Sequence, residues 1–209
     1  PQTSRKKFIC PEQVITINSV HKGIKKEIRQ WSKHALEIPN PEFNDLPACP
    51  YAKAAWKDDK VDIVFKETDD YSIVFDTILN WDDTKELVIV ADTSFIEVED
   101  EFHKYLDDIN ECISEKIFED QDFWVMGFHP YQDSNELIDD GTFEGISDTE
   151  YALIFVQRLS KLQEASDKLV GRNYYDRYFK TYDVSEMYDI RKEYYRRLKD
   201  ARIKESRPS

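Results

Sequence analysis

Glu86-Leu87-Val88-Ile89-Val90-Ala91 is a short stretch in which every residue after the first is apolar. An uninterrupted apolar run of this length predicts a strand that is buried on both faces at the centre of a sheet. Phe123-Trp124-Val125-Met126-Gly127-Phe128 predicts a second buried strand, and the stretch from Val61 to Lys66 predicts a third. These strands decide the fold class, because a doubly buried sheet needs a layer of helices on each face.

Segments with helical spacing separate these strands. Apolar residues recur at steps of three and four over about residues 19–37, 71–81 and 96–116, which predicts three amphipathic helices. A shorter helix is expected from Pro50 through Trp56, because proline suits the first turn of a helix. Strands that alternate with helices predict an α/β domain, or a layered α+β domain, with functional groups at the carboxyl ends of the strands.

A polar loop rich in Asp and Glu is expected over residues 130–148, followed by one more helix that is closed by Gly171. A last helix near residues 184–204 has only a narrow apolar stripe, so it must pack on the body or on another chain. The sequence therefore predicts one α/β domain over residues 1–171 and an aromatic, basic helical tail over residues 172–209. The apolar positions that predict the helix before Gly171 are Ala152, Leu153, Val156, Leu159, Leu162, Ala165 and Leu169.

The distribution of charge limits the classes of partner. The chain of 209 residues has a formal net charge of −14. The segment from residue 157 onward is mildly basic, with 14 Lys and Arg against 9 Asp and Glu, so the excess acid lies in residues 1–156. An acidic body repels nucleic acid and anionic membranes, and neither is expected as a partner. The basic tail suits an acidic surface of the body or of a sister subunit, which leaves a homo-oligomer open.

Cysteine use and hydropathy indicate the compartment. Cys10, Cys49 and Cys112 are an odd number at irregular spacing, which does not indicate a disulfide framework. No apolar run approaches the roughly 18 residues that a membrane span needs. No glycine-rich phosphate loop is present, so ATP, NAD or flavin binding by the usual fingerprints is disfavoured and no cofactor is identified. We expect a cytoplasmic protein.

Two short motifs contain side chains with reactive chemistry. Leu46-Pro47-Ala48-Cys49-Pro50-Tyr51-Ala52-Lys53 places Cys49 at the predicted start of a helix, where backbone N–H groups and the helix dipole favour a thiolate. Gly127-Phe128-His129-Pro130 places His129 at the carboxyl end of a predicted strand. The alternative for each is a structural role, as a small buried thiol and as an imidazole bonded to backbone.

With this layout, the chain resembles an uncharacterised bacterial family, domain of unknown function 1415. The resemblance covers about residues 19–170 and rests on Trp31, the Cys49-Pro50-Tyr51-Ala52 motif, Phe128-His129-Pro130 and the helix around Arg158-Leu159. A Pro-rich stretch before Cys49 and the sequence Asp139 to Thr149 depart from the family pattern. The family carries no established activity, so the resemblance implies that Cys49 and His129 matter without saying why.

Three functions are compatible with these residues. In the first, the chain is an enzyme in which Cys49 is a thiolate, His129 is its base, and Tyr51, Lys53 and Arg158 bind a small, anionic substrate. In the second, the chain is a non-catalytic interaction or oligomeric protein that uses its acidic body and aromatic tail. The third is a metal-dependent enzyme built on His129 and the carboxylates of the acidic loop, at Asp133, Glu136, Asp139 and Asp140, although no second His lies at ligand spacing.

Overall fold

The computed structural model describes residues 11–131, 149–181 and 185–205. Its centre is a four-stranded mixed sheet in the order β3-β4-β6-β5. β3 and β4 are parallel, whereas β6 runs antiparallel to both of its neighbours, so that β5 points in the same direction as β3 and β4. The strands are β3 (Val61–Lys66), β4 (Leu87–Asp92), β5 (Trp124–Phe128) and β6 (Ala152–Gln157).

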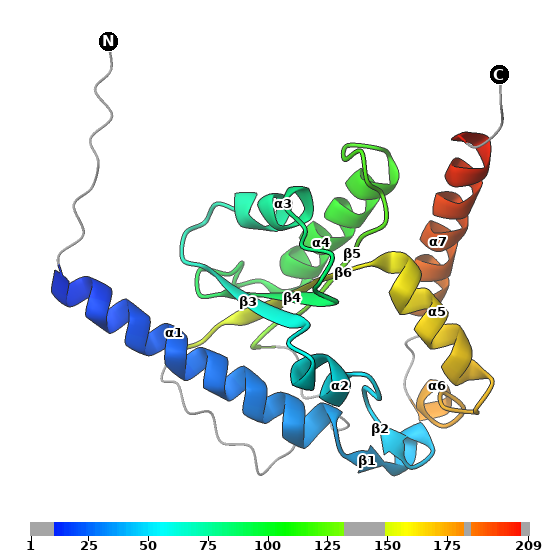
Figure 1. Ribbon diagram of the computed structural model, residues 1–209, viewed down its shortest axis with the longest axis horizontal. Helices are drawn as coiled ribbons and strands as arrows, with labels where there is room; N and C mark the ends of the chain where they lie inside the picture. The colour runs from blue at the N-terminus through cyan, green and yellow to red at the C-terminus, as the bar shows by residue number, and fades with distance from the viewer. Residues whose placement is uncertain (1–10, 132–148, 182–184, 206–209) are drawn as a thin grey trace.

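Helices cover both faces of this sheet, which confirms the predicted α/β class (Figure 1). α1 (Pro11–Trp31) and α2 (Ala52–Lys57) pack on one face. α3 (Ser72–Leu79) and α4 (Glu99–Ser114) pack on the other. The predicted strands and helices of this region all form, with boundaries that differ by a few residues except at the start of α1.

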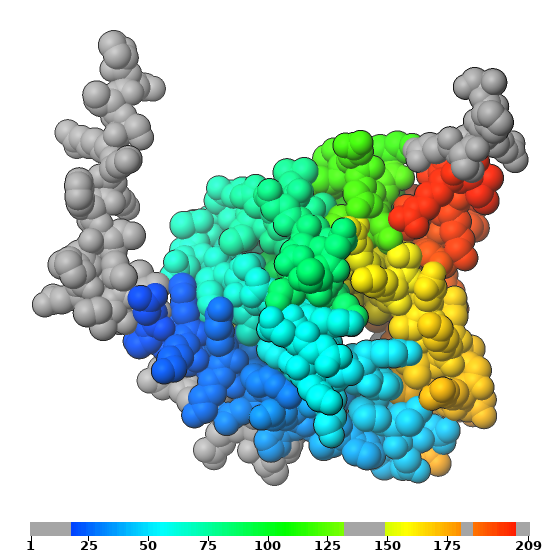
Figure 2. Space-filling view, viewed as in Figure 1, coloured from blue at the N-terminus to red at the C-terminus, as the bar shows by residue number. Residues whose placement is uncertain are grey.

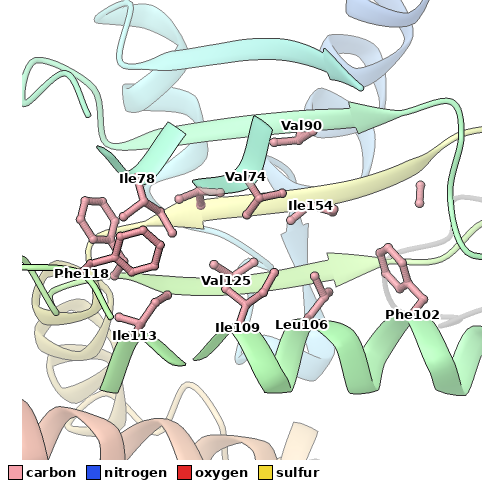
Figure 3. Close-up of a cluster of buried hydrophobic side chains, with 13 residues drawn as sticks. Val74, Ile78, Val90, Phe102, Leu106, Ile109, Ile113, Phe118, Val125 and Ile154 are labelled. Carbon is pink, nitrogen blue, oxygen red and sulfur yellow. The ribbon is translucent and has the colours of Figure 1, made fainter. Parts of the chain in front are cut away.

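The larger core lies between the sheet and α4. Phe102, Leu106, Ile109 and Ile113 follow the three- and four-residue spacing of one helix face and point toward the strands (Figure 3). Each side chain is almost completely buried against residues such as Val90, Val125 and Ile154 of β4, β5 and β6. Burial of apolar area on this scale is the main favourable contribution to folding.

Gly127 allows α4 to approach β5 closely. A Cβ atom added at Gly127 would lie 2.7 Å from Leu106 Cδ1 and 2.8 Å from Phe102 Cε1. These are buried side chains held by their neighbours, so neither has free space in which to move. The glycine in the Gly127-Phe128-His129 motif is therefore explained by the packing of α4.

One buried side-chain amide forms hydrogen bonds with backbone groups on the free edge of β5. The Asn110 side chain, from α4, donates to the Val125 carbonyl at 2.8 Å and accepts from the Val125 N–H at 2.9 Å. Both hydrogen bonds replace those that a neighbouring strand would make at an edge. At the opposite edge, the Asp62 carboxylate accepts from the Ile63 N–H at 2.8 Å, which satisfies a donor of β3 locally.

The prediction of one helix over residues 152–169 is wrong for its first part. Residues Ala152–Gln157 form β6, and the helix that follows, α5, spans Leu159–Val170. The apolar run from Ala152 to Val156 fits both spacings, and it becomes a strand because β4 and β5 bond to its two edges and both of its faces are covered.

The Pro-rich segment before Cys49 forms short elements of regular structure. α1 continues into a short π-helix, η1 (Ser32–Leu36). β1 (Pro39–Asn40) then pairs with β2 (Leu46–Pro47) in a small antiparallel ladder, with the 3-10 turn η2 (Pro41–Phe43) between them. Prolines are tolerated here because this ladder has only two strands, each with an edge that needs no donor.

The C-terminal helices pack against the body of the same chain. α6 (Tyr178–Thr181) precedes α7 (Ser185–Glu205), and α7 contacts α5 and α4. Arg191 of α7 is buried and donates to Gln163 Oε1 at 3.0 Å and Ser166 Oγ at 2.8 Å. Described aromatic side chains of the tail also have partners within the chain, as Tyr174 shows by packing on Phe43. None of the described helices is long and apolar enough to cross a membrane.

Replacing Asn110 with Ala is expected to destabilise the fold strongly. The change leaves the Val125 N–H and carbonyl buried without partners, which costs about 2–4 kcal/mol of unfolding free energy. Urea unfolding of the purified variant measures this loss. The control is Asn80→Ala, whose exposed amide donates to the Asp76 carbonyl, with an expected loss below about 1 kcal/mol. Equal losses of unfolding free energy in the two variants would contradict the role of Asn110 in satisfying the Val125 backbone.

Two glycine substitutions are expected to change stability in opposite directions. Gly127→Ala drives a Cβ atom into Leu106 and Phe102, and overpacking of this kind costs about 1–3 kcal/mol. Gly23→Ala, in α1, meets no atom within 4 Å and removes a flexible residue from a helix, which stabilises by about 0.5–1 kcal/mol. The thermal unfolding midpoints of both variants, compared with the parent, measure these changes. A Gly127→Ala protein as stable as the parent would refute the close approach of α4.

Candidate functional site

The carboxyl ends of β3, β4 and β5 each carry a buried polar side chain on the same face of the sheet. Side chains alternate between faces along a strand, so Val125, Gly127 and His129 share the α4 face. Lys66 and Asp92 end β3 and β4 in register with each other. His129 is only 4% exposed. In α/β sheets, functional groups gather at the carboxyl ends of the strands.

Lys66 and Asp92 form a buried ion pair. Lys66 Nζ lies 2.8 Å from Asp92 Oδ1, with side-chain exposures of 1% and 0%. The ammonium also donates to the Ser94 carbonyl and lies 3.9 Å from the centre of the Tyr71 ring, in a cation–π contact. The Ser94 N–H donates to the same Asp92 oxygen at 3.0 Å. The pair ties the ends of two parallel strands to the loop after β4 and is closed to solvent.

Both ring nitrogens of His129 are bonded to backbone. Tyr131 N–H donates to Nδ1 at 3.2 Å, so Nδ1 is the unprotonated nitrogen, and Nε2 donates to the Ile96 carbonyl at 2.8 Å. Phe95, Phe102 and Tyr131 surround the ring at centroid distances of 5.3–5.4 Å. In this arrangement neither nitrogen is free to accept a proton from a thiol or to bind a metal ion.

Cys49 lies on the other side of the sheet, three residues before α2. Its N–H donates to the Leu36 carbonyl at 3.0 Å and its carbonyl accepts from the Ala52 N–H at 3.1 Å. Burial raises the pKa of the Cys49 thiol, and the charge of the Glu37 carboxylate raises it further against the opposing effect of the Tyr51 and Ala52 amides. This direction is opposite to the lowered pKa expected at a helix start, because Cys49 is partly buried and outside a helix of only six residues.

Cys49 and His129 take their contacts from different parts of the chain. The contacts of Cys49 come from the segments around η1 and α2. Those of His129 come from the loop after β4 and from α4. The sheet separates the two sets, because Phe128 faces Trp31 of α1 whereas Gly127 faces α4. The contacts of the described residues therefore do not support a shared Cys49–His129 pocket.

Arg158 forms ion pairs and an aromatic contact within the protein. Its guanidinium pairs with Asp83 Oδ1 at 2.7 Å and with Asp120, and it stacks 4.3 Å from the centre of the Phe123 ring. Asp83 and Asp120 lie in the segments that lead into β4 and β5. Arg158 therefore connects the amino ends of these strands, whereas Lys66 and Asp92 lie at carboxyl ends. The predicted substrate-binding role of Arg158 has no support in these contacts.

Lys53 lines an open groove between α2 and the segment formed by the end of α1, η1 and the two residues after η1, with a volume of about 470 Å³. In the space-filling view, side chains of these two segments lie next to each other on the face toward the viewer (Figure 2). Tyr51, the other predicted contact on α2, is 43% exposed and precedes the helix without lining the groove. The residues that line the groove are Arg29, Lys33, Glu37, Ile38, Lys53, Trp56 and Lys57.

Two pairs of basic residues give this groove its charge, and sequence reasoning identified only Lys53. Arg29 and Lys33 are four residues apart, as are Lys53 and Lys57, which places each pair on one helix face. The Arg29 guanidinium forms an ion pair with Glu37 and lies 5.0 Å from the centre of the Trp56 ring. This paired spacing is visible in the sequence, but nothing there shows that the two helices meet.

A metal site has no support in the described part of the chain. Among those residues, no group of three or more His, Cys, Asp and Glu side chains is arranged to hold a metal ion. The acidic loop proposed to assist His129, with Asp133, Glu136, Asp139 and Asp140, lies outside the described residues.

Comparison with models of known families, with curated proteins and with solved structures finds no match to this chain. The resemblance to domain of unknown function 1415 stays a prediction.

Cys49 is expected to react slowly with iodoacetamide near neutral pH. In a Cys10→Ser, Cys112→Ser background, its labelling rate should fall below that of the urea-unfolded chain, because the raised pKa keeps the thiol protonated. The rate should continue to rise with pH beyond the neutral range. His129→Ala is expected to leave the rate unchanged. Rapid labelling that levels off near pH 7 and slows in His129→Ala would restore the thiolate mechanism.

Proposed function

We propose that this protein binds a small organic anion in the groove between α1 and α2. The observation that carries the proposal is the cluster of Arg29, Lys33, Lys53 and Lys57 around an open groove, on a chain whose formal net charge is −14. Clefts lined by one sign of charge raise the local concentration of ligands of the opposite sign. A volume of about 470 Å³ is in the range of small-molecule sites.

The groove keeps a net positive charge after its internal ion pair is counted. Arg29, together with Ser32, holds the pKa of Glu37 below its usual value despite partial burial, so the Glu37 carboxylate is ionised and offsets the guanidinium. Within the described part of the chain, Lys33, Lys53 and Lys57 form no ion pair. Three uncompensated ammonium groups therefore remain to meet a ligand.

The chemistry of the groove favours a phosphate or carboxylate attached to an apolar group. Lysine ammonium groups on flexible stems bind such anions as point charges without demanding one geometry. Ile38 is 51% exposed and Trp56 forms part of the wall, so the groove also offers apolar surface. The Trp56 indole is fixed by its hydrogen bond to Ser32 Oγ at 2.9 Å.

Binding, rather than attack by Cys49, is the role that the contacts favour. Cys49 lies next to the groove through its neighbours Leu36 and Glu37, but its thiol is held in the protonated form. We propose that Cys49 supports the wall of the groove and that Lys53 contacts the ligand.

The cysteines favour a reducing compartment. Cys49 and Cys112 are both free, and on this ground we propose that the protein is cytoplasmic.

Reversal of one groove charge is expected to weaken anion binding. With inorganic pyrophosphate as the probe, isothermal titration at low salt should show binding to the parent chain and about a tenfold or greater loss for Lys53→Glu and for Lys33→Glu. Lys168→Glu is the matched control, because this exposed lysine of α5 lies outside the groove and its reversal changes the net charge equally. Equal pyrophosphate affinities in Lys53→Glu and Lys168→Glu, or no binding to the parent chain, would contradict the proposal.

A further inference from the structure

Among the described residues, three buried oxygen atoms at the carboxyl end of the sheet form no hydrogen bond of normal geometry. They are Asp92 Oδ2 and the hydroxyls of Tyr71 and Tyr105. Asp92 itself is 0% exposed. Buried polar atoms are nearly always paired, and an orphan loses the hydrogen bonds that it makes to water in the unfolded chain. Three such orphans together are costly on the scale of the stability of a whole domain.

These atoms lie in one cluster. Tyr71, in the segment that enters α3, and Tyr105 of α4 have ring centroids 4.3 Å apart. The charge of Asp92 acts on both hydroxyls, and the Tyr71 hydroxyl faces the carboxylate without forming a hydrogen bond of normal geometry. These contacts gather the three oxygens around one carboxylate, so one shared partner is the simplest way to satisfy them.

The protonation of the cluster defines what it can bind. Burial and the Asp92 charge raise the pKa of both Tyr71 and Tyr105, so both hydroxyls keep their protons and can donate. Asp92 Oδ2 can only accept. Lys66 cannot serve Oδ2, because its ammonium is directed to Asp92 Oδ1 and to the Ser94 carbonyl.

The ligand that matches this set is neutral, small, and both donor and acceptor. Lys66 already neutralises Asp92, which removes the attraction for a further cation. The described residues around Asp92 also lack the group of three His, Cys, Asp or Glu side chains that a metal ion would need. A water molecule accepts from a tyrosine hydroxyl and donates to a carboxylate at the same time, and buried waters typically make about three such bonds.

We propose that one internal water molecule bridges Asp92 Oδ2 and the hydroxyls of Tyr71 and Tyr105. It joins the end of β4, the entry to α3 and the middle of α4 on one face of the sheet. This site is independent of the anion groove, which lies on the α1 and α2 face.

A high-resolution crystal structure of the parent chain tests the proposal. The expected result is one density peak at about 2.7–3.0 Å from all three oxygens. In Tyr105→Phe, which removes one partner and little volume, the peak should weaken or vanish, and it should persist in Tyr195→Phe, whose hydroxyl binds only at the exposed Glu164. In solution, long-lived water cross-peaks to the Tyr71 and Tyr105 rings should fall in Tyr105→Phe and stay in Tyr195→Phe.

Two outcomes would overturn the proposal. In the first, the Tyr71 hydroxyl bonds Asp92 Oδ2 directly, with no density between the three oxygens. In the second, the peak shows short contacts of about 2.3–2.6 Å to additional oxygen ligands, which identify a cation. Neither outcome affects the pyrophosphate measurement, so the two proposals fail separately.

Discussion

Burial of both faces of β4 and β6 is the constraint on which the rest of this structure depends. A central strand with helices on either side cannot carry polar side chains along its length, so they are confined to strand ends and sheet edges. This explains why Lys66, Asp92 and His129 occupy the carboxyl ends, where each is paired with a neighbour or with backbone. It also explains why Asn110 must reach the backbone of β5, whose outer edge has no strand beside it.

The sequence was sufficient for the strands and helices whose periodicity has one interpretation. β3, β4 and β5 and helices α3, α4 and α7 form where the apolar spacing predicts them. β6 was missed, because the run from Ala152 to Val156 satisfies helical spacing as well, and only the pairing with β4 and β5 selects the strand. Pairing across sixty or more residues of sequence, as between β4 and β6, has no local signature.

The candidate site was less predictable than the fold. Sequence motifs singled out Cys49 and His129 because each is a reactive side chain next to a proline, but a motif does not specify which face of a sheet a residue meets. The structure adds that a His129 ring nitrogen is bonded to the Ile96 carbonyl and that the Cys49 N–H donates to the Leu36 carbonyl, which are tertiary contacts that a motif does not encode. The basic groove forms where two helices meet, and the cluster of Tyr71, Asp92 and Tyr105 combines side chains from three elements. Residue spacing in the sequence therefore predicts neither site.

The position of β6 has a consequence for synthesis of the chain. Three sheet strands precede β6 in the sequence, yet β6 lies between β4 and β5. On the ribosome, β3 and β4 can pair as soon as both have emerged, while β5 has no neighbour in the sheet until residues 152–157 leave the exit tunnel. During this interval the inner edges of β4 and β5 have no strand beside them, and unpaired strand edges are the sites at which an unfinished sheet pairs with another chain.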